Sequence, residues 1–133
     1  MKKLYDTSAL LNLLLSSGSK SLDTISGQAI LALTKYELGN SIWKFSYLQK
    51  KITKKEACAL FDTALCVLDT MNVLTINGIE GDIQNLSIDV GESFYDISYV
   101  GVAKKYNLEL ITDDKKLQKK ARECKIKVSD SGV

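Results

Sequence analysis

The stretch from Phe94 to Leu117 constrains the fold most, because it places a helix, a strand and a second helix in direct succession. It reads FYDISYVGVAKKYNLELITDDKKL. Its pattern predicts a helix that ends in a turn at Tyr106-Asn107, a strand over Glu109–Thr112, and a helix that begins at Asp113-Asp114. Helices and strands that alternate in this way are typical of α/β proteins.

The rest of the chain shows the same alternation. We expect further helices at Ala9–Leu15, at about Lys35–Gln49, after a capping box of Thr53 and Glu56, and around Ile79–Val90, where Gly91 ends the helix. The predicted strands are Lys2–Asp6, Ala29–Leu33, Val73–Ile76, Glu109–Thr112 and Ile126–Val128. The sequence therefore predicts one α/β domain over residues 1–133, with a largely parallel sheet.

The segment Ala9–Leu15 is apolar on nearly every side, and Thr7-Ser8 offers its N-terminal cap. A helix of this kind needs cover all round, so we expect the sheet on one side and a second subunit on the other. The Tyr and Phe residues also exceed what one core of this size requires. The chain is therefore predicted to form a homodimer. The following segment, Ser16–Gly27, is predicted to be a polar loop with a short helical piece around Leu22–Ile25.

Asp96 is the first acidic residue that needs an explanation. On a helical wheel it falls between Val100 and Ala103, in the middle of the face expected to be buried. An unpaired buried charge costs several kcal/mol, so this carboxylate requires a cation or strong hydrogen-bond donors.

Three more acids are predicted to lie near Asp96. Asp6 and Asp114 follow strands, where open α/β sheets place their ligands, and Glu37 lies near the start of a helix beside that edge. Asp6 alone fits an N-cap, and Glu37 alone fits a surface residue favoured by the helix dipole. Carboxylates about 4 Å apart repel by on the order of 4 kcal/mol per pair, so such a cluster favours bound cations. A site made only of oxygen ligands favours Mg²⁺ or Mn²⁺.

Composition excludes several kinds of catalysis. The chain has no histidine, so serine triads, Cys–His pairs and histidine-based ribonuclease chemistry are excluded. Cys58, Cys66 and Cys124 form no CxxC pair and cannot complete an ordinary zinc site, so we expect free thiols in a reducing cytosol. Any hydrolysis must then depend on carboxylates, lysines or a metal.

Charge is unevenly spread along the chain. The net charge is +2, but Lys104–Lys127 carries eight Lys and one Arg against four acidic residues. This bias suits a polyanionic partner, and it equally suits a solvated Lys-rich helix face. The N-terminus resembles a signal peptide only superficially, because Asp6 and Asn12 interrupt its apolar run. No apolar run is long enough to span a membrane, so a cytoplasmic protein is expected.

Three segments together resemble a known family. They read YDTSALL near the start, then LTKYELGN, then the stretch from Phe94 to Leu117. Their order and spacing resemble the PIN domain, and within it the small toxin nucleases of VapBC-type toxin–antitoxin pairs. The last segment is the most specific, since an Asp, a helix of small residues and a strand followed by T-x-D-x-x-L occur together.

The resemblance implies a three-layer α/β/α fold with a central, mostly parallel sheet of four to five strands. It implies a ribonuclease that depends on Mg²⁺ or Mn²⁺ and prefers single strands, with an RNA substrate, an antitoxin protein and a homodimer as partners. The family's acidic catalytic and metal-binding positions fall on Asp6, Glu37, Asp96 and Asp114, with Ser8 and Thr112 as supporting hydroxyls. The T-x-D pattern selects Asp114, although Asp113 is also possible.

Two other functions remain open from the sequence. One is a non-catalytic PIN-like module for RNA binding or assembly, against which the presence of all four acids counts. The other is a receiver-like domain that accepts a phosphoryl group on an Asp after its third strand. Here the third predicted strand ends in Ile76-Asn77-Gly78, without such an Asp. Incubation with RNA and Mn²⁺, with and without a chelator, separates the three.

Overall fold

The computed structural model describes residues Met1–Val133 and contains a five-stranded sheet in the order β3-β2-β1-β4-β5. All four strand pairs are parallel. The strands are β1 (Lys3–Tyr5), β2 (Ala29–Leu31), β3 (Asn72–Leu74), β4 (Glu109–Ile111) and β5 (Val128–Ser129). The helices are α1 (Thr7–Ser17), α2 (Leu22–Ile25), α3 (Thr34–Trp43), α4 (Lys54–Leu68), α5 (Glu80–Val90), α6 (Phe94–Tyr106) and α7 (Lys115–Glu123).

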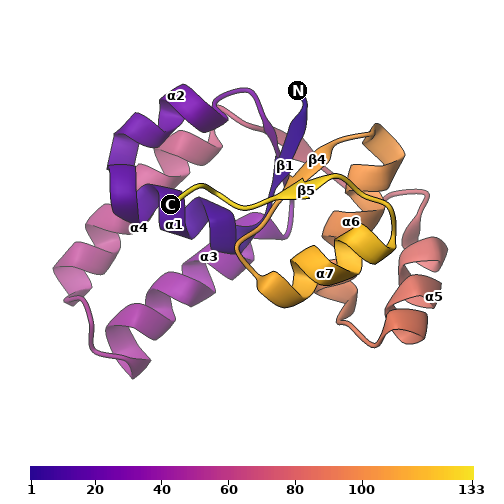
Figure 1. Cartoon of the computed structure of the whole chain (residues 1–133). Coiled ribbons are helices and arrows are strands. Elements are labelled where there is room, and N and C mark those ends of the chain that lie inside the picture. Colours follow the sequence, from indigo (N-terminus) through magenta and orange to yellow (C-terminus); the bar gives the residue numbers. More distant parts are fainter.

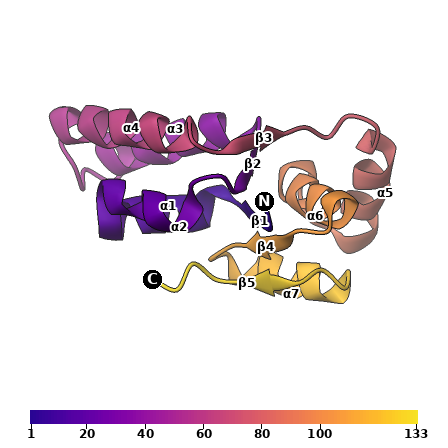
Figure 2. The ribbon, with the colours of Figure 1, turned by 90° about the horizontal axis from the view of Figure 1, so that it is seen from above.

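The sheet lies between two helical layers, as Figures 1 and 2 show. Successive strand residues point to opposite faces, so Tyr5 and Ile111 join a core with α1–α4, whereas Leu4 and Leu110 join a second core with α5–α7. A parallel sheet needs cover on both faces, and this arrangement supplies it. The predicted three-layer α/β/α fold is confirmed. Several strands are one or two residues shorter than predicted, and β5 begins two residues late because Ile126 N–H donates to the Ala121 carbonyl in the turn after α7.

The segment predicted as a polar loop is mostly helical. Helix α1 continues to Ser17, and a 3-10 turn over Gly18–Ser21 then connects it to α2. The leucines of α1 pack in the same core as Ile25 of α2 and Val67 of α4, and only Leu15 is half exposed, at 50%. The chain's own helices therefore cover α1, and the argument for a second subunit on this helix is wrong.

Helix α3 and helix α4 form a long hairpin whose connection projects away from the sheet (Figures 1 and 2). The predicted helix from Lys35 to Gln49 has nearly the right extent, but its second half widens into a π-helical turn at Lys44–Leu48. The predicted capping box at the start of α4 is confirmed, since the Thr53 hydroxyl accepts from Glu56 N–H and the Glu56 carboxylate accepts from Thr53 N–H. Gly91 ends α5 in the left-handed conformation, as predicted.

The pairing of β1 with β4 determines what meets at the carboxyl edge of the sheet. Tyr5 pairs with Ile111, so the residues that follow them, Asp6 and Thr112, lie side by side. The Asp6 N–H donates to the Ile111 carbonyl at 3.0 Å, which extends the ladder to this point. Helices α1 and α7 both begin at this edge, so their N-termini face the same space. None of the helices is both long and apolar enough to cross a membrane.

Candidate active site

A hollow of about 480 Å³ opens at the carboxyl edge of the sheet, between α1, α3 and the start of α6. All four predicted acids line it, and so does the alternative Asp113. The complete lining is Asp6, Thr7, Ser8, Leu11, Asn12, Glu37, Asn40, Ser41, Lys44, Asp96, Tyr99, Asp113 and Asp114. The structure thus brings together residues from four separate parts of the chain.

Asp6 is the most deeply buried of these acids. It is 5% exposed, and it is the N-cap of α1, which confirms the capping role that the sequence offered for Asp6 and not the cap at Thr7-Ser8. Its Oδ1 accepts hydrogen bonds from the Ser8 hydroxyl at 2.7 Å and from Ala9 N–H at 3.0 Å. Its Oδ2 accepts from the Thr112 hydroxyl. Asp6 therefore both caps α1 and lines the hollow. The two predicted supporting hydroxyls, those of Ser8 and Thr112, both contact it.

The carboxylates of the hollow disfavour one another's ionisation. Burial raises the pKa of Asp6 to about 6, and the nearby charge of Asp114 adds to this, although hydrogen bonds from Thr112, Ala9 and Ser8 oppose it. Burial also raises the pKa of Asp96, with further contributions from Asp114, Glu37 and Glu92. The protein's three ion pairs involve none of the four predicted acids. The negative charge of the hollow is thus not compensated by a paired cation.

Glu37 is held by hydroxyl groups that sequence reasoning missed. Its Oε1 accepts from the Tyr99 hydroxyl at 2.7 Å and from the Thr7 hydroxyl at 2.9 Å, and its Oε2 accepts none. Tyr99 is 1% exposed, and its hydroxyl lies 2.8 Å from that of Thr34, which accepts from Leu31 N–H. Burial, followed by the charge of Glu37, raises the pKa of Tyr99, so it remains a donor. The available signal was a tyrosine one helical turn after Asp96.

Asp96 lies in the first turn of α6 and is half buried, at the rim of the hollow. The face predicted to be buried is buried, since Tyr99, Val100 and Ala103 are at most 1% exposed, but Asp96 itself is only half buried. Helix α6 buries four consecutive residues, Ile97–Val100, so it is covered around most of its circumference and has no single inner face. Asp96 escapes full burial because it is near the helix start, where Ser93 caps the helix by accepting from Asp96 N–H.

The two adjacent acids after β4 have different roles. Asp113 accepts hydrogen bonds from Asn12 at 2.7 Å and from both the N–H and the hydroxyl of Ser131, at 2.7 and 2.6 Å. Burial alone would raise the pKa of Asp113, but these hydrogen bonds outweigh it and lower the pKa. Asp113 thus ties the C-terminal segment to α1. Asp114 caps α7 through Oδ1, which accepts from Lys116 and Leu117 N–H groups, while its Oδ2 accepts no hydrogen bond.

The donor chemistry of the hollow fits a hard divalent cation, because every candidate ligand is an oxygen and most are carboxylates. The side chains are spread around the hollow, however, and no three acids are close enough to hold one ion between them. Lys44 is the one basic residue that lines the hollow.

An all-parallel α/β sheet with acidic side chains gathered at its carboxyl edge places this protein among the α/β proteins that bind ligands at that edge. Comparison with known families narrows the class. The chain belongs to the PIN domain family, whose sequence pattern matches residues 3–123.

Individual relatives agree with this assignment. The chain is 32% identical to Exonuclease VapC9 of Pyrobaculum aerophilum over 94 residues, which cover 71% of this chain and 67% of that protein. The crystal structure of PAE2754 from the same organism superposes with a TM-score of 0.81 at 28% identity, covering 98% of this chain and 90% of that one. VapBC2 of Rickettsia felis, bound to a DNA fragment from its promoter, shares the fold with a TM-score of 0.67 at 16% identity, covering 98% of each chain.

The pKa of Asp6 predicts how metal-free stability depends on pH. A folded pKa of about 6, above the ordinary value, means that the folded state resists losing this proton. The folded state is therefore destabilised as pH rises from about 4 to about 7, by up to roughly 3 kcal/mol. Asp6→Asn keeps the cap and removes the ionisation, so it should flatten this loss.

Urea unfolding in EDTA gives the free energy of unfolding of the parent and of Asp6→Asn at pH 4.5 and at pH 7.5. The effect is the change with pH in the difference between the two proteins. Asp113→Asn is the matched control, since the lowered pKa of Asp113 stabilises the fold above the ordinary pKa and is lost as pH falls. Because pH 4.5 and pH 7.5 both lie above that ordinary pKa, Asp113→Asn should change the free energy of unfolding by nearly the same amount at the two pH values. A stability of Asp6→Asn that falls with pH as steeply as that of the parent contradicts the assignment.

Proposed function

We propose that this chain is a metal-dependent endoribonuclease that hydrolyses RNA phosphodiester bonds in the acidic hollow. The observation that carries the proposal is the convergence of Asp6, Glu37, Asp96 and Asp114 on one hollow without a paired cation. Acids arranged for stability would be paired, whereas here two of them have raised pKa values. A bound cation would remove that penalty, so the arrangement suits a protein that works with metal.

The proposed ligands are Asp6, Asp96, Asp114 and Glu37, for Mg²⁺ or Mn²⁺. When bound, such an ion stabilises the charge that develops on phosphodiester oxygens and makes water a better nucleophile at neutral pH. The chain's own groups orient the ligands. Ser8 and Thr112 fix both oxygens of Asp6, and Tyr99 fixes one oxygen of Glu37 and leaves the other free.

Asp114, and not Asp113, is proposed as the fourth ligand. Asp114 retains a carboxylate oxygen without a hydrogen bond, and its charge acts on both Asp6 and Asp96. The charge of Asp113 acts on neither of them, and its hydrogen bonds from Asn12 and Ser131 connect the C-terminal segment to α1. Asp114 is proposed to bind metal, whereas Asp113 connects the C-terminal segment to α1. Asn substitutions at these two neighbouring residues therefore form a matched pair of variants.

Asp114→Asn is therefore expected to lower ribonuclease activity by at least about a hundredfold, because it weakens metal binding. Asp113→Asn should retain most of the activity at a temperature where it is folded. The substrate is a labelled circular single-stranded RNA with Mn²⁺, since a circle can be opened only by internal cleavage. EDTA should abolish the reaction.

The alternatives give other results in the same assay. A non-catalytic module would bind the circle and leave it intact with Mn²⁺. Cleavage of linear RNA but not of the circle would indicate an exonuclease, the activity named for the relative VapC9. Equal losses of ribonuclease activity in Asp114→Asn and Asp113→Asn would overturn the choice of Asp114 as the ligand.

We also propose two protein partners. Solved structures that share the fold include the VapBC-1 complex of Haemophilus influenzae and a toxin–antitoxin complex of Klebsiella pneumoniae, at 16% and 22% identity. A hollow with five acids and one lysine suits an antitoxin that inserts an Arg or Lys side chain and displaces metal. A homodimer is supported by large apolar side chains left exposed, among them Ile88 at 70% and Tyr95 at 61%.

Light scattering at high micromolar concentration should give about twice the 14.7 kDa mass of one chain. A mass of one chain throughout the concentration range counts against the dimer. A purified complex with the antitoxin should cleave RNA more slowly than the free protein. Equal rates would show that the antitoxin leaves the hollow open.

A further inference from the structure

We infer that the tip of the α3–α4 hairpin is a binding surface for single-stranded nucleic acid, which leads the strand into the acidic hollow. This basic tip comprises Trp43–Lys55: the end of α3, the π-helical turn, the connection and the start of α4. The inference rests on the proposed ribonuclease function, because it names the path by which the RNA substrate reaches the hollow. Binding is tested without metal, so the two proposals fail separately.

Two aromatic rings at the basic tip form an exposed platform. Trp43 and Tyr47 stack with their centroids 5.6 Å apart and their planes at 11°. They remain 48% and 61% exposed, although aromatic side chains of this size usually gain from burial. Lys50 places its ammonium 4.7 Å from the centre of the Tyr47 ring. A near-parallel aromatic pair with a cation beside it is the arrangement on which bases of a single strand stack, whatever their sequence.

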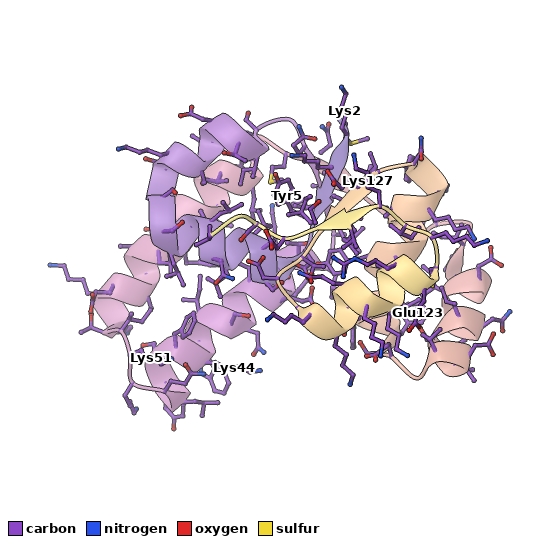
Figure 3. The ribbon with its side chains drawn as sticks, in the orientation of Figure 1. Lys2, Tyr5, Lys44, Lys51, Glu123 and Lys127 are labelled. Carbon is purple, nitrogen blue, oxygen red and sulfur yellow. The ribbon has the colours of Figure 1, made fainter.

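Lysines dominate the charge of the basic tip. Lys44, Lys50, Lys51, Lys54 and Lys55 all occur within it, and the first acid after Trp43 is Glu56. Glu56 is engaged in the capping box of α4, and none of the five lysines forms an ion pair. Figure 3 shows Lys44 and Lys51 at the end of the molecule opposite to Lys2 and Lys127. Five lysines without a carboxylate partner, close in sequence to an aromatic pair, suit a chain of phosphates.

Helix α3 connects the basic tip to the hollow. Asn40, Ser41 and Lys44 line the hollow, and Lys44 directly follows Trp43 in the sequence. On the other side, Trp43, Tyr47 and Lys50 line a groove of about 670 Å³ between the π-helical turn and α4. We infer that a strand stacked on the platform next meets Lys44, which lines the same hollow as the carboxylates. The π-helical turn itself is a feature that occurs often at functional sites.

The charge of the basic tip favours a nucleic acid over a protein. A second copy of this chain docked on the same surface would bring two sets of five lysines together, at a cost in repulsion. Another basic hollow, with Lys2 and Lys127 among its lining, lies at the opposite edge of the sheet. It has no stacked aromatic pair, and Lys127 there already lies 4.0 Å from Glu109. Substitutions in that hollow therefore provide a control for binding by positive charge alone.

The experiment uses the protein's single tryptophan, Trp43, as its own probe. The parent protein in EDTA is titrated with single-stranded oligoadenylate of about twelve nucleotides, and Trp43 emission is followed. Saturable quenching is expected, and duplex RNA of the same length should quench much less. Tyr47→Ala and the double variant Lys50→Gln/Lys51→Gln should each weaken binding by about tenfold. The charge-matched control Lys2→Gln/Lys127→Gln should bind as the parent does, and thermal melts confirm that each variant is folded.

Several results would overturn the inference. One is the absence of oligoadenylate binding, and another is binding without quenching of Trp43. A third is an equal loss in the control variant, which would show that charge alone matters. A shift of Trp43 emission to shorter wavelength with protein concentration alone would show that a second copy covers the platform. Quenching without Mn²⁺-dependent cleavage would leave this inference standing and remove the nuclease proposal.

Discussion

The site depends on the parallel pairing of β1 with β4. The register that sets Tyr5 against Ile111 also places Asp6 beside Thr112, and the hydroxyl of Thr112 then holds one oxygen of the Asp6 carboxylate. Thr112 also accepts from Asp114 N–H at 3.1 Å, so one hydroxyl orders both acids. A shift of one residue in this register would turn Asp6 to the other face of the sheet. The hydrophobic cores on both faces resist such a shift, because Leu4 and Tyr5 would exchange environments.

Burial of the Asp6 carboxylate lowers the stability of the folded protein, and hydrogen bonds reduce this cost only in part. Three hydrogen bonds hold the Asp6 carboxylate, yet its pKa remains raised to about 6. Buried carboxylates are usually paired with a basic side chain, because an unpaired buried charge costs several kcal/mol. Lys44 is the one basic residue in the lining, and it forms no ion pair. We interpret the uncompensated charge as the preparation of a site for an external cation, with the stability of the metal-free protein reduced as a result.

Local patterns in the sequence were sufficient for much of the fold and for the positions of the acids. Strand-ending acids such as Asp6 and Asp114 could be placed because parallel strands bring their carboxyl ends to one edge. The contact between Tyr99 and Glu37 could not, since it joins residues 62 apart whose helices meet only in the folded chain. The half-exposure of Asp96 could not be predicted, because a helical wheel shows which face a residue occupies and not that the residue lies in the exposed first turn. The short helix at Leu22–Ile25 was predicted, but the extension of α1 to Ser17 and the 3-10 turn over Gly18–Ser21 were missed, because these residues are polar and give no apolar periodicity.

The central claim is that the acids of the hollow are arranged for a divalent cation, and Mn²⁺-dependent thermal melting of the parent and of Asp96→Asn tests it most directly. Without metal, relief of repulsion should leave the variant as stable as the parent or more so. Millimolar Mn²⁺ should raise the melting temperature of the parent by mass action, and raise that of the variant much less. The control Asp89→Asn, on the exposed side of α5, should respond as the parent does. If Asp96→Asn is less stable in EDTA and gains as much from Mn²⁺ as the parent, Asp96 is structural and the claim is wrong.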